Sequence, residues 1–193
     1  MSSEKIQKSE KTGEGGFSLI EAVIAIFIIT IGLIGTAAAI TFALEFGAIS
    51  QNVTKAKLVI VASIEEVETL RNSRRLNYKQ IANVGKVDNT DSQNVFGGFS
   101  TDLKPVGLNP GPDGVNGTDD DLRDPGKDGA FGTTDDFDNP TLARGGFWRK
   151  IEITNLSESL KKIEVTVRYV GRGGKLGEIS GVSYLNDEAR TNQ

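Results

Sequence analysis

The chain has 193 residues, of which 37% are hydrophobic, enough for one folded domain with a modest core or for one small domain plus an appended segment. It contains no cysteine and no histidine, which excludes a disulfide framework, a thiol nucleophile and the commonest general base. The net charge is -4, but residues 110–139 hold nine aspartates against one arginine and one lysine, so the acidity is local. These absences argue against an enzyme.

A short polar segment, residues 1–16, precedes an uninterrupted apolar run from Phe17 to Leu44 that holds one charge, Glu21. As a helix this run would extend about 42 Å, enough to cross a bilayer. A cleaved secretory signal peptide would have a shorter apolar run and a basic leader, although the small residues at 36–39 offer a cleavage site. A plain membrane anchor would leave the Glu21 carboxylate unpaired in an apolar segment.

The third interpretation accounts for that carboxylate. The stretch GGFSLIE, residues 15–21, is similar to the class III signal of type IV prepilins. The resemblance implies that a prepilin peptidase cuts after Gly16 and then methylates the new amino group of Phe17. It also implies that Glu21 pairs with the Phe17 ammonium of a neighbouring subunit, because a buried charge is tolerable only when paired.

Apolar residues continue past the membrane run at three- and four-residue spacing, which predicts that the same helix extends to about Asn72. This stripe comprises Val53, Ala56, Ile60, Ile64, Val67 and Leu70. Because the second half of the helix is amphipathic, it needs a sheet to pack on. The apolar half contains Gly32 and Gly35 but no proline, whereas many major pilins carry one there, and this departure favours a minor pilin or a pseudopilin.

The C-terminal part predicts antiparallel strands. Strict alternation in Lys162–Tyr169 indicates one strand, with Phe147–Thr154 before it and Glu178–Leu185 after a glycine-rich turn. A short helix is expected near Tyr78–Ala82. The strand order is similar to the C-terminal sheet of PilV-type minor pilins and type II secretion pseudopilins. The fold class is therefore predicted as α+β: a pilin fold with one long N-terminal helix packed on a C-terminal antiparallel sheet.

An acidic repeat with a period of 15 lies between the helix and the sheet. The sequence PGPDGVNGTDDD at Pro110–Asp121 aligns with PGKDGAFGTTDD at Pro125–Asp136. Glycine-permitted turns rich in carboxylate and carbonyl oxygens suit Ca²⁺, although EF-hand spacing is absent. The alternative is a solvated acidic insertion. The predicted calcium ligands are the aspartates that recur: Asp113, Asp120, Asp121, Asp128, Asp135 and Asp136.

The predicted organisation is a leader at 1–16, a helix at 17–72 with 17–44 in the membrane or filament core, and a head at 73–193 with the acidic loop 110–139. The resemblance implies a minor type IV pilus subunit that contributes to assembly or tip function. A type II secretion pseudopilin and a calcium-dependent adhesin that uses pilin biogenesis are the alternatives.

The expected partners are the prepilin peptidase, other pilins in a helical filament and an inner-membrane assembly platform. No nucleic acid is expected, because the basic residues form no stripe with interleaved aromatics. The resemblance implies a single pass through the inner membrane, with the leader in the cytoplasm and the head outside. After assembly the chain would lie in a filament on the cell surface.

Overall fold

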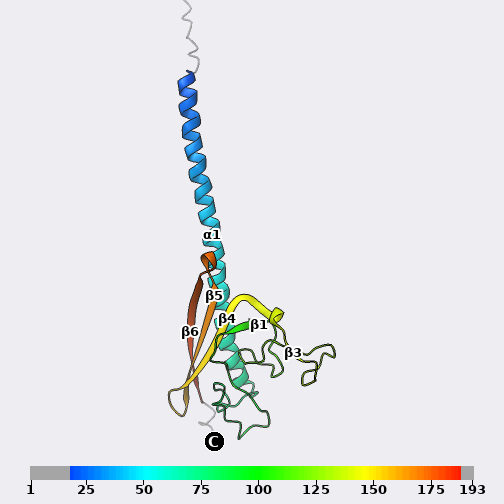
Figure 1. Ribbon diagram of the computed structural model, residues 1–193. Helices are drawn as coiled ribbons and strands as arrows, with labels where there is room; N and C mark the ends of the chain where they lie inside the picture. The colour runs from blue at the N-terminus through cyan, green and yellow to red at the C-terminus, as the bar shows by residue number, and fades with distance from the viewer. Residues whose placement is uncertain (1–17, 188–193) are drawn as a thin grey trace, which may run out of the picture. The chain divides into compact units, whose positions relative to one another are not determined.

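The computed structural model describes residues 18–187, so the predictions that concern Gly16 and Phe17 lie outside the described residues. The described chain divides into two compact units, one ending at Phe46 and one beginning at Gly47. Helix α1, Leu19–Asn72, begins in the first unit and ends in the second (Figure 1). Its observed start lies within two residues of the predicted one.

The N-terminal unit consists of the apolar part of α1. Its most apolar 18-residue window has a mean hydropathy of 2.6 and no buried residue, so the helix is long and apolar enough to cross a membrane. The hydroxyls of Thr30, Thr36 and Thr41 donate to backbone carbonyls three or four residues earlier, at 2.7, 2.9 and 3.0 Å. These polar groups are therefore satisfied within the helix, as a lipid environment requires.

In the head, the second half of α1 buries one face. Its buried residues are Ala56, Val59, Ile60, Ser63, Val67 and Leu70. The predicted apolar stripe is thus largely confirmed, with Ile64 half-buried and packed against the core. The helix ends where Arg74 adopts a φ of 58° and the Leu76 N–H donates to the Leu70 carbonyl at 3.0 Å.

The head contains a four-stranded sheet in the order β1-β4-β5-β6, with antiparallel pairs throughout (Figure 1). The strands are β1 Lys104–Gly107, β4 Ala143–Asn155, β5 Leu160–Val170 and β6 Leu176–Asn186. All three strands predicted from alternation are confirmed and extend slightly further. The predicted α+β arrangement, a long helix packed on a C-terminal antiparallel sheet, is confirmed.

The inner face of the sheet supplies much of the hydrophobic core. Ile151, Ile163, Val165 and Val167 are fully buried there. On β6, a Cβ added at Gly181 would collide with Cγ2 of Ile60 on α1. Helix and sheet therefore approach closely at this point.

Two polar side chains fasten the irregular chain after α1 to the sheet. The Asn83 side chain binds both backbone groups of Ile153 on β4: it donates to the carbonyl at 3.1 Å and accepts from the N–H at 2.8 Å. The buried Lys161 ammonium on β5 donates to the carbonyls of Tyr78 and Ile81 at 2.6 and 2.7 Å. These contacts hold residues 78–83 against β4 and β5.

The predicted short helix near Tyr78–Ala82 is wrong, because this segment forms a turn. Asn77 and Gln80 exchange hydrogen bonds between side chain and backbone N–H at 2.8 and 3.0 Å, which closes a single turn. The carbonyls that would continue a helix are engaged elsewhere, by Lys161 and by the Phe99 N–H. Tertiary contacts override the local preference.

Candidate functional site

The apolar unit presents a fully exposed hydrophobic surface around one carboxylate. Leu19, Phe27 and Leu44 are 84%, 67% and 71% exposed. Glu21 is exposed in the first turn of α1, where its N–H donates to the Ser18 carbonyl at 3.0 Å. An apolar surface of this extent needs lipid or other subunits to cover it. The pairing of Glu21 with the Phe17 ammonium of a neighbouring subunit stays a prediction.

The acidic repeat folds as two loops of the same conformation, the first copy at Pro110–Asp121 and the second copy at Pro125–Asp136. Three glycines in each copy have positive φ, a region that favours glycine. The angles are 64°, 65° and 92° at Gly111, Gly114 and Gly117, against 69°, 69° and 89° at Gly126, Gly129 and Gly132. The two copies therefore have the same backbone conformation at their three equivalent glycines.

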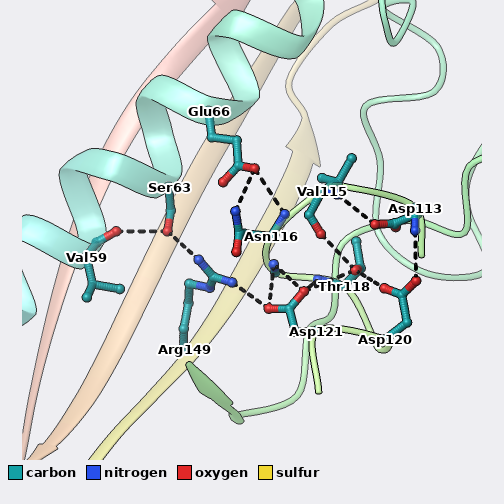
Figure 2. A network of polar contacts seen from close by, with 11 residues as sticks. Val59, Ser63, Glu66, Asp113, Val115, Asn116, Thr118, Asp120, Asp121 and Arg149 are labelled. Carbon is teal, nitrogen blue, oxygen red and sulfur yellow. Dashed lines mark hydrogen bonds and ion pairs between the residues drawn. The ribbon is translucent and has the colours of Figure 1, made fainter. Parts of the chain in front are cut away.

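In the first copy the aspartates bind their own loop (Figure 2). Asp113 Oδ1 accepts from the backbone N–H two residues later at 2.7 Å. The Asp121 carboxylate accepts from the Gly117 N–H at 2.9 and 3.0 Å. The Thr118 hydroxyl donates to one Asp120 oxygen, and the other accepts from the Asp113 N–H at 3.2 Å. The carboxylates therefore act as internal acceptors for backbone donors.

The second copy repeats most of these hydrogen bonds at the equivalent residues, although Asp135 accepts from the Lys127 N–H at 2.8 Å. Asp128 Oδ1 accepts from the N–H two residues later at 2.9 Å, and Asp136 accepts from the Gly132 N–H at 2.8 Å. The Thr133 hydroxyl donates to Asp135 at 2.7 Å. Because two separate stretches adopt the same bonded structure, the motif specifies its own conformation.

The two copies are related by a local two-fold pairing. Each is followed by a two-residue strand, β2 Arg123–Asp124 or β3 Phe137–Asp138, and these strands pair antiparallel. Arg123 and Asp138, which are 15 residues apart and hence equivalent, are register partners. An antiparallel pair that joins equivalent positions has a local two-fold relation.

The first copy is docked on the head core through a buried polar network (Figure 2). Arg149 on β4 donates to Asp121 Oδ2 at 2.8 Å and to Ser63 Oγ on α1 at 3.0 Å. Glu66 on α1 accepts from the N–H and the side-chain amide of Asn116, at 3.0 and 2.9 Å. The loop therefore contacts both layers of the fold.

Burial sets the electrostatics of this network. Burial lowers the pKa of Arg149, and the neighbouring Asp121 carboxylate acts in the opposite direction. Burial raises the pKa of Asp121, and Arg149 and the loop N–H groups act in the opposite direction. Burial also raises the pKa of Asp113 to about 6, with repulsion from Asp120 acting in the same direction.

The second copy is exposed along most of its length. Phe131 occupies the position that Asn116 holds in the first copy and is 41% exposed. Ala130 is exposed at the position where Val115 is 1% exposed. The same loop is thus docked in one copy and undocked in the other.

The six predicted calcium ligands are divided between the copies. Asp113, Asp120 and Asp121 lie in the first copy, and Asp128, Asp135 and Asp136 lie in the second. Within residues 18–187, no group of three or more acidic side chains is arranged to hold a metal ion. Their oxygens accept hydrogen bonds from their own loops, and calcium binding stays a prediction.

The residues that dock the first copy were not among the predicted site residues. Ser63 interrupts the apolar stripe of α1, and Arg149 stands at an inward position of β4 among isoleucines. Two polar residues at core positions are a signal for a buried polar contact, since such groups need partners. Asn116 carried no comparable signal, because it is not shared between the copies.

Comparison with known proteins agrees with the N-terminal features. Residues 11–37 match the family model described as the prokaryotic N-terminal methylation motif. This match indicates a type IV pilin-like prepilin, of the pilin or pseudopilin kind. No curated protein and no solved structure matches the chain. The motif implies processing by a prepilin peptidase and assembly with other pilins, and the apolar helix fits membrane anchoring before assembly.

Proposed function

We propose that the chain is a minor structural subunit of a type IV pilus, cleaved after Gly16 and methylated at Phe17. The observation that carries this proposal is the methylation motif placed directly on a continuous, fully exposed apolar helix. The apolar side chains of this helix are exposed in the described residues, so its surface suits first a bilayer and then a filament core.

The head supports a structural role. Its buried cations hold the fold together. Lys161 donates to backbone carbonyls, and Arg149 donates to the Asp121 carboxylate of the first copy. The chain offers no histidine or cysteine for catalysis. Its role is therefore assembly rather than chemistry, with contributions to pilus assembly or to the tip.

A type II secretion pseudopilin is the second candidate. Helix α1 continues through Gly32 and Gly35 without a break, and the apolar half contains no proline. This uninterrupted helix favours a minor pilin and a pseudopilin equally over a major pilin.

Before assembly the chain would span the cytoplasmic membrane once, with the leader in the cytoplasm and the head outside. The assembly platform would then move it into a filament on the cell surface.

Mass spectrometry of sheared surface filaments tests the proposal. The expected chain begins at Phe17 with an N-methyl group, and it accumulates with its leader intact in cells that lack prepilin peptidase. Deleting the pilus assembly ATPase should remove it from the surface, whereas deleting the secretion ATPase should not. A mature chain that begins at Met1 or near Ala39, or filaments that lack the chain, would contradict the proposal.

A further inference from the structure

Two neighbouring residues in the middle of the second copy, Ala130 and Phe131, form an exposed surface that we call its apex; the equivalent apex of the first copy is Val115 and Asn116. Phe131 is 41% exposed, and Ala130 beside it is exposed. Hydrogen bonds from Thr133 and to Asp128 and Asp136 fix the loop from within. Because the backbone is already ordered, contact with a partner costs little conformational entropy, and an aromatic tip is a favourable anchor.

The first copy shows how an apex of this kind docks. Val115 is 1% exposed there, and Asn116 makes two hydrogen bonds with Glu66 on α1 (Figure 2). The surface that receives the apex lies between α1 and β4, the elements that carry Glu66 and Arg149. The head therefore already contains one such apex in contact with α1, in a loop that β4 also binds.

A groove adjoins the docked apex on the same face. It has a volume of about 250 Å³ and is lined by Lys55, Val59, Arg144, Gly145 and Phe147. Two of these residues, Val59 and Arg144, also line the depression that contains Asn116. The groove is thus continuous with the surface that binds the first copy.

Charge favours an acidic loop in this groove. Residues 124–138 carry five aspartates and one lysine, whereas the groove is lined by Lys55 and Arg144 with no acidic residue. Val59 and Phe147 add apolar surface to the same lining. Complementary charge around an apolar centre is the arrangement that gives an interface its specificity.

We propose that the second copy of one subunit docks in this groove of a neighbouring copy of the same chain, with Phe131 as its anchor. The donor and acceptor surfaces are different parts of the chain, so the contact is head-to-tail and propagates along a filament. The inference rests on the proposed function as a filament subunit. It requires that copies be adjacent, so even a low-abundance subunit would occur in runs.

Disulfide cross-linking tests this contact in filaments, because the chain has no cysteine of its own. Cells express two differently tagged full-length chains, Ala130→Cys and Gly145→Cys. Both positions are exposed, and a side chain at Gly145 meets open space. Sheared filaments are oxidised mildly and run on a non-reducing gel. The expected product is a dimer that carries both tags.

Three controls make the result specific. Phe131→Ser in the Ala130→Cys chain should lower the yield of dimer at least tenfold, whereas Phe137→Ser, an equally large change at an exposed position of β3, should not. Leu156 is exposed in the turn between β4 and β5, and a chain with Leu156→Cys in place of Ala130→Cys should give a low yield of mixed dimer.

Filaments that contain both chains but give no mixed dimer would overturn the inference while leaving the proposed function intact. An equal yield from the Leu156→Cys pair, or dimers formed by Ala130→Cys alone, would also overturn it. Absence of the wild-type chain from filaments would overturn the proposed function and this inference with it.

Discussion

Arg149 and Asp121 form a buried ion pair, with Nη2 and Oδ2 2.8 Å apart and side chains that are 7% and 4% exposed. The same guanidinium donates to Ser63 on α1 at 3.0 Å. One side chain on β4 therefore connects the acidic repeat to the helix. Because a buried charge left without its partner is strongly unfavourable, this pair makes the fold of the head depend on the docked loop.

Removal of the Asp121 charge should destabilise the head. Asp121→Asn leaves the buried Arg149 without its ion-pair partner, at an expected cost of about 3 to 5 kcal/mol in the free energy of unfolding. Urea titration of the detergent-solubilised chain measures it, with the single tryptophan, Trp148 on β4, as the probe. The matched control is Asp136→Asn in the second copy, which should shift the midpoint far less. Equal shifts would contradict a role specific to the ion pair.

The close approach of α1 and β6 predicts intolerance of a single methyl group. In Gly181→Ala the added Cβ collides with Cγ2 of Ile60, so the helix or strand must shift, at a cost of about 1 to 3 kcal/mol. Gly145→Ala is the matched control, because a Cβ there meets open space. Thermal unfolding of both variants should separate them clearly. A Gly181→Ala variant as stable as wild type would show that this contact is loose.

Asp113 should make stability fall as the pH rises from about 4 to 6. Burial raises its pKa to about 6 from the usual 3.8, so between these values the native chain binds a proton that the unfolded chain does not. The stabilisation is present below the lower value and is lost as the pH passes the upper one.

Asp113→Asn keeps the Oδ1 acceptor of the Val115 N–H and removes the charge. At pH 7 the variant should be more stable by about 1 kcal/mol, allowing for partial solvent screening, and its loss of stability between pH 4 and 6 should be smaller. The exposed equivalent, Asp128→Asn, is the control. A pH profile parallel to that of wild type would contradict the raised pKa.

Much of the fold was predictable because its signals are local. Alternation marked β4, β5 and β6, and three- and four-residue spacing carried α1 to Asn72. The turn at Tyr78–Gln80 was not predicted as such, because Lys161 engages the carbonyls of Tyr78 and Ile81, from which it is separated by 83 and 80 residues. Contacts at that separation leave no periodic trace in the sequence.

The repeat illustrates a second limit. Its period identified which residues share a role, such as Asp113 with Asp128, but not which groups their oxygens face. An aspartate followed by glycine commonly accepts the N–H two residues later, and this local chemistry forms in both copies. The docking of only one copy depends on Arg149 and Glu66, which lie outside the repeat.

Glu21 should matter for assembly more than for processing. Its carboxylate is exposed in an apolar helix surface, so its value must come from a partner gained in the filament. Glu21→Ala should leave cleavage after Gly16 largely intact and lower incorporation into sheared filaments at least tenfold. Thr30→Ala on the same helix is the control, since that hydroxyl bonds its own backbone. Incorporation of Glu21→Ala at the wild-type level would contradict the pairing role.

Calcium binding is the prediction for which the repeat provides the sharpest internal control. If the six recurring aspartates bind Ca²⁺ in the native state alone, the melting temperature of the chain should rise with calcium and fall with chelator. A hundredfold excess over Kd corresponds to about 2.7 kcal/mol. Magnesium should act more weakly, because it requires a tighter octahedral site.

Asp135→Asn with Asp136→Asn removes carboxylates from the second copy and spares the Arg149 pair, so it should abolish part of the calcium shift without unfolding the sheet. A melting curve indifferent to millimolar calcium, with no heat of binding, would leave these carboxylates with the one role that their hydrogen bonds already give them, which is to hold each loop in shape.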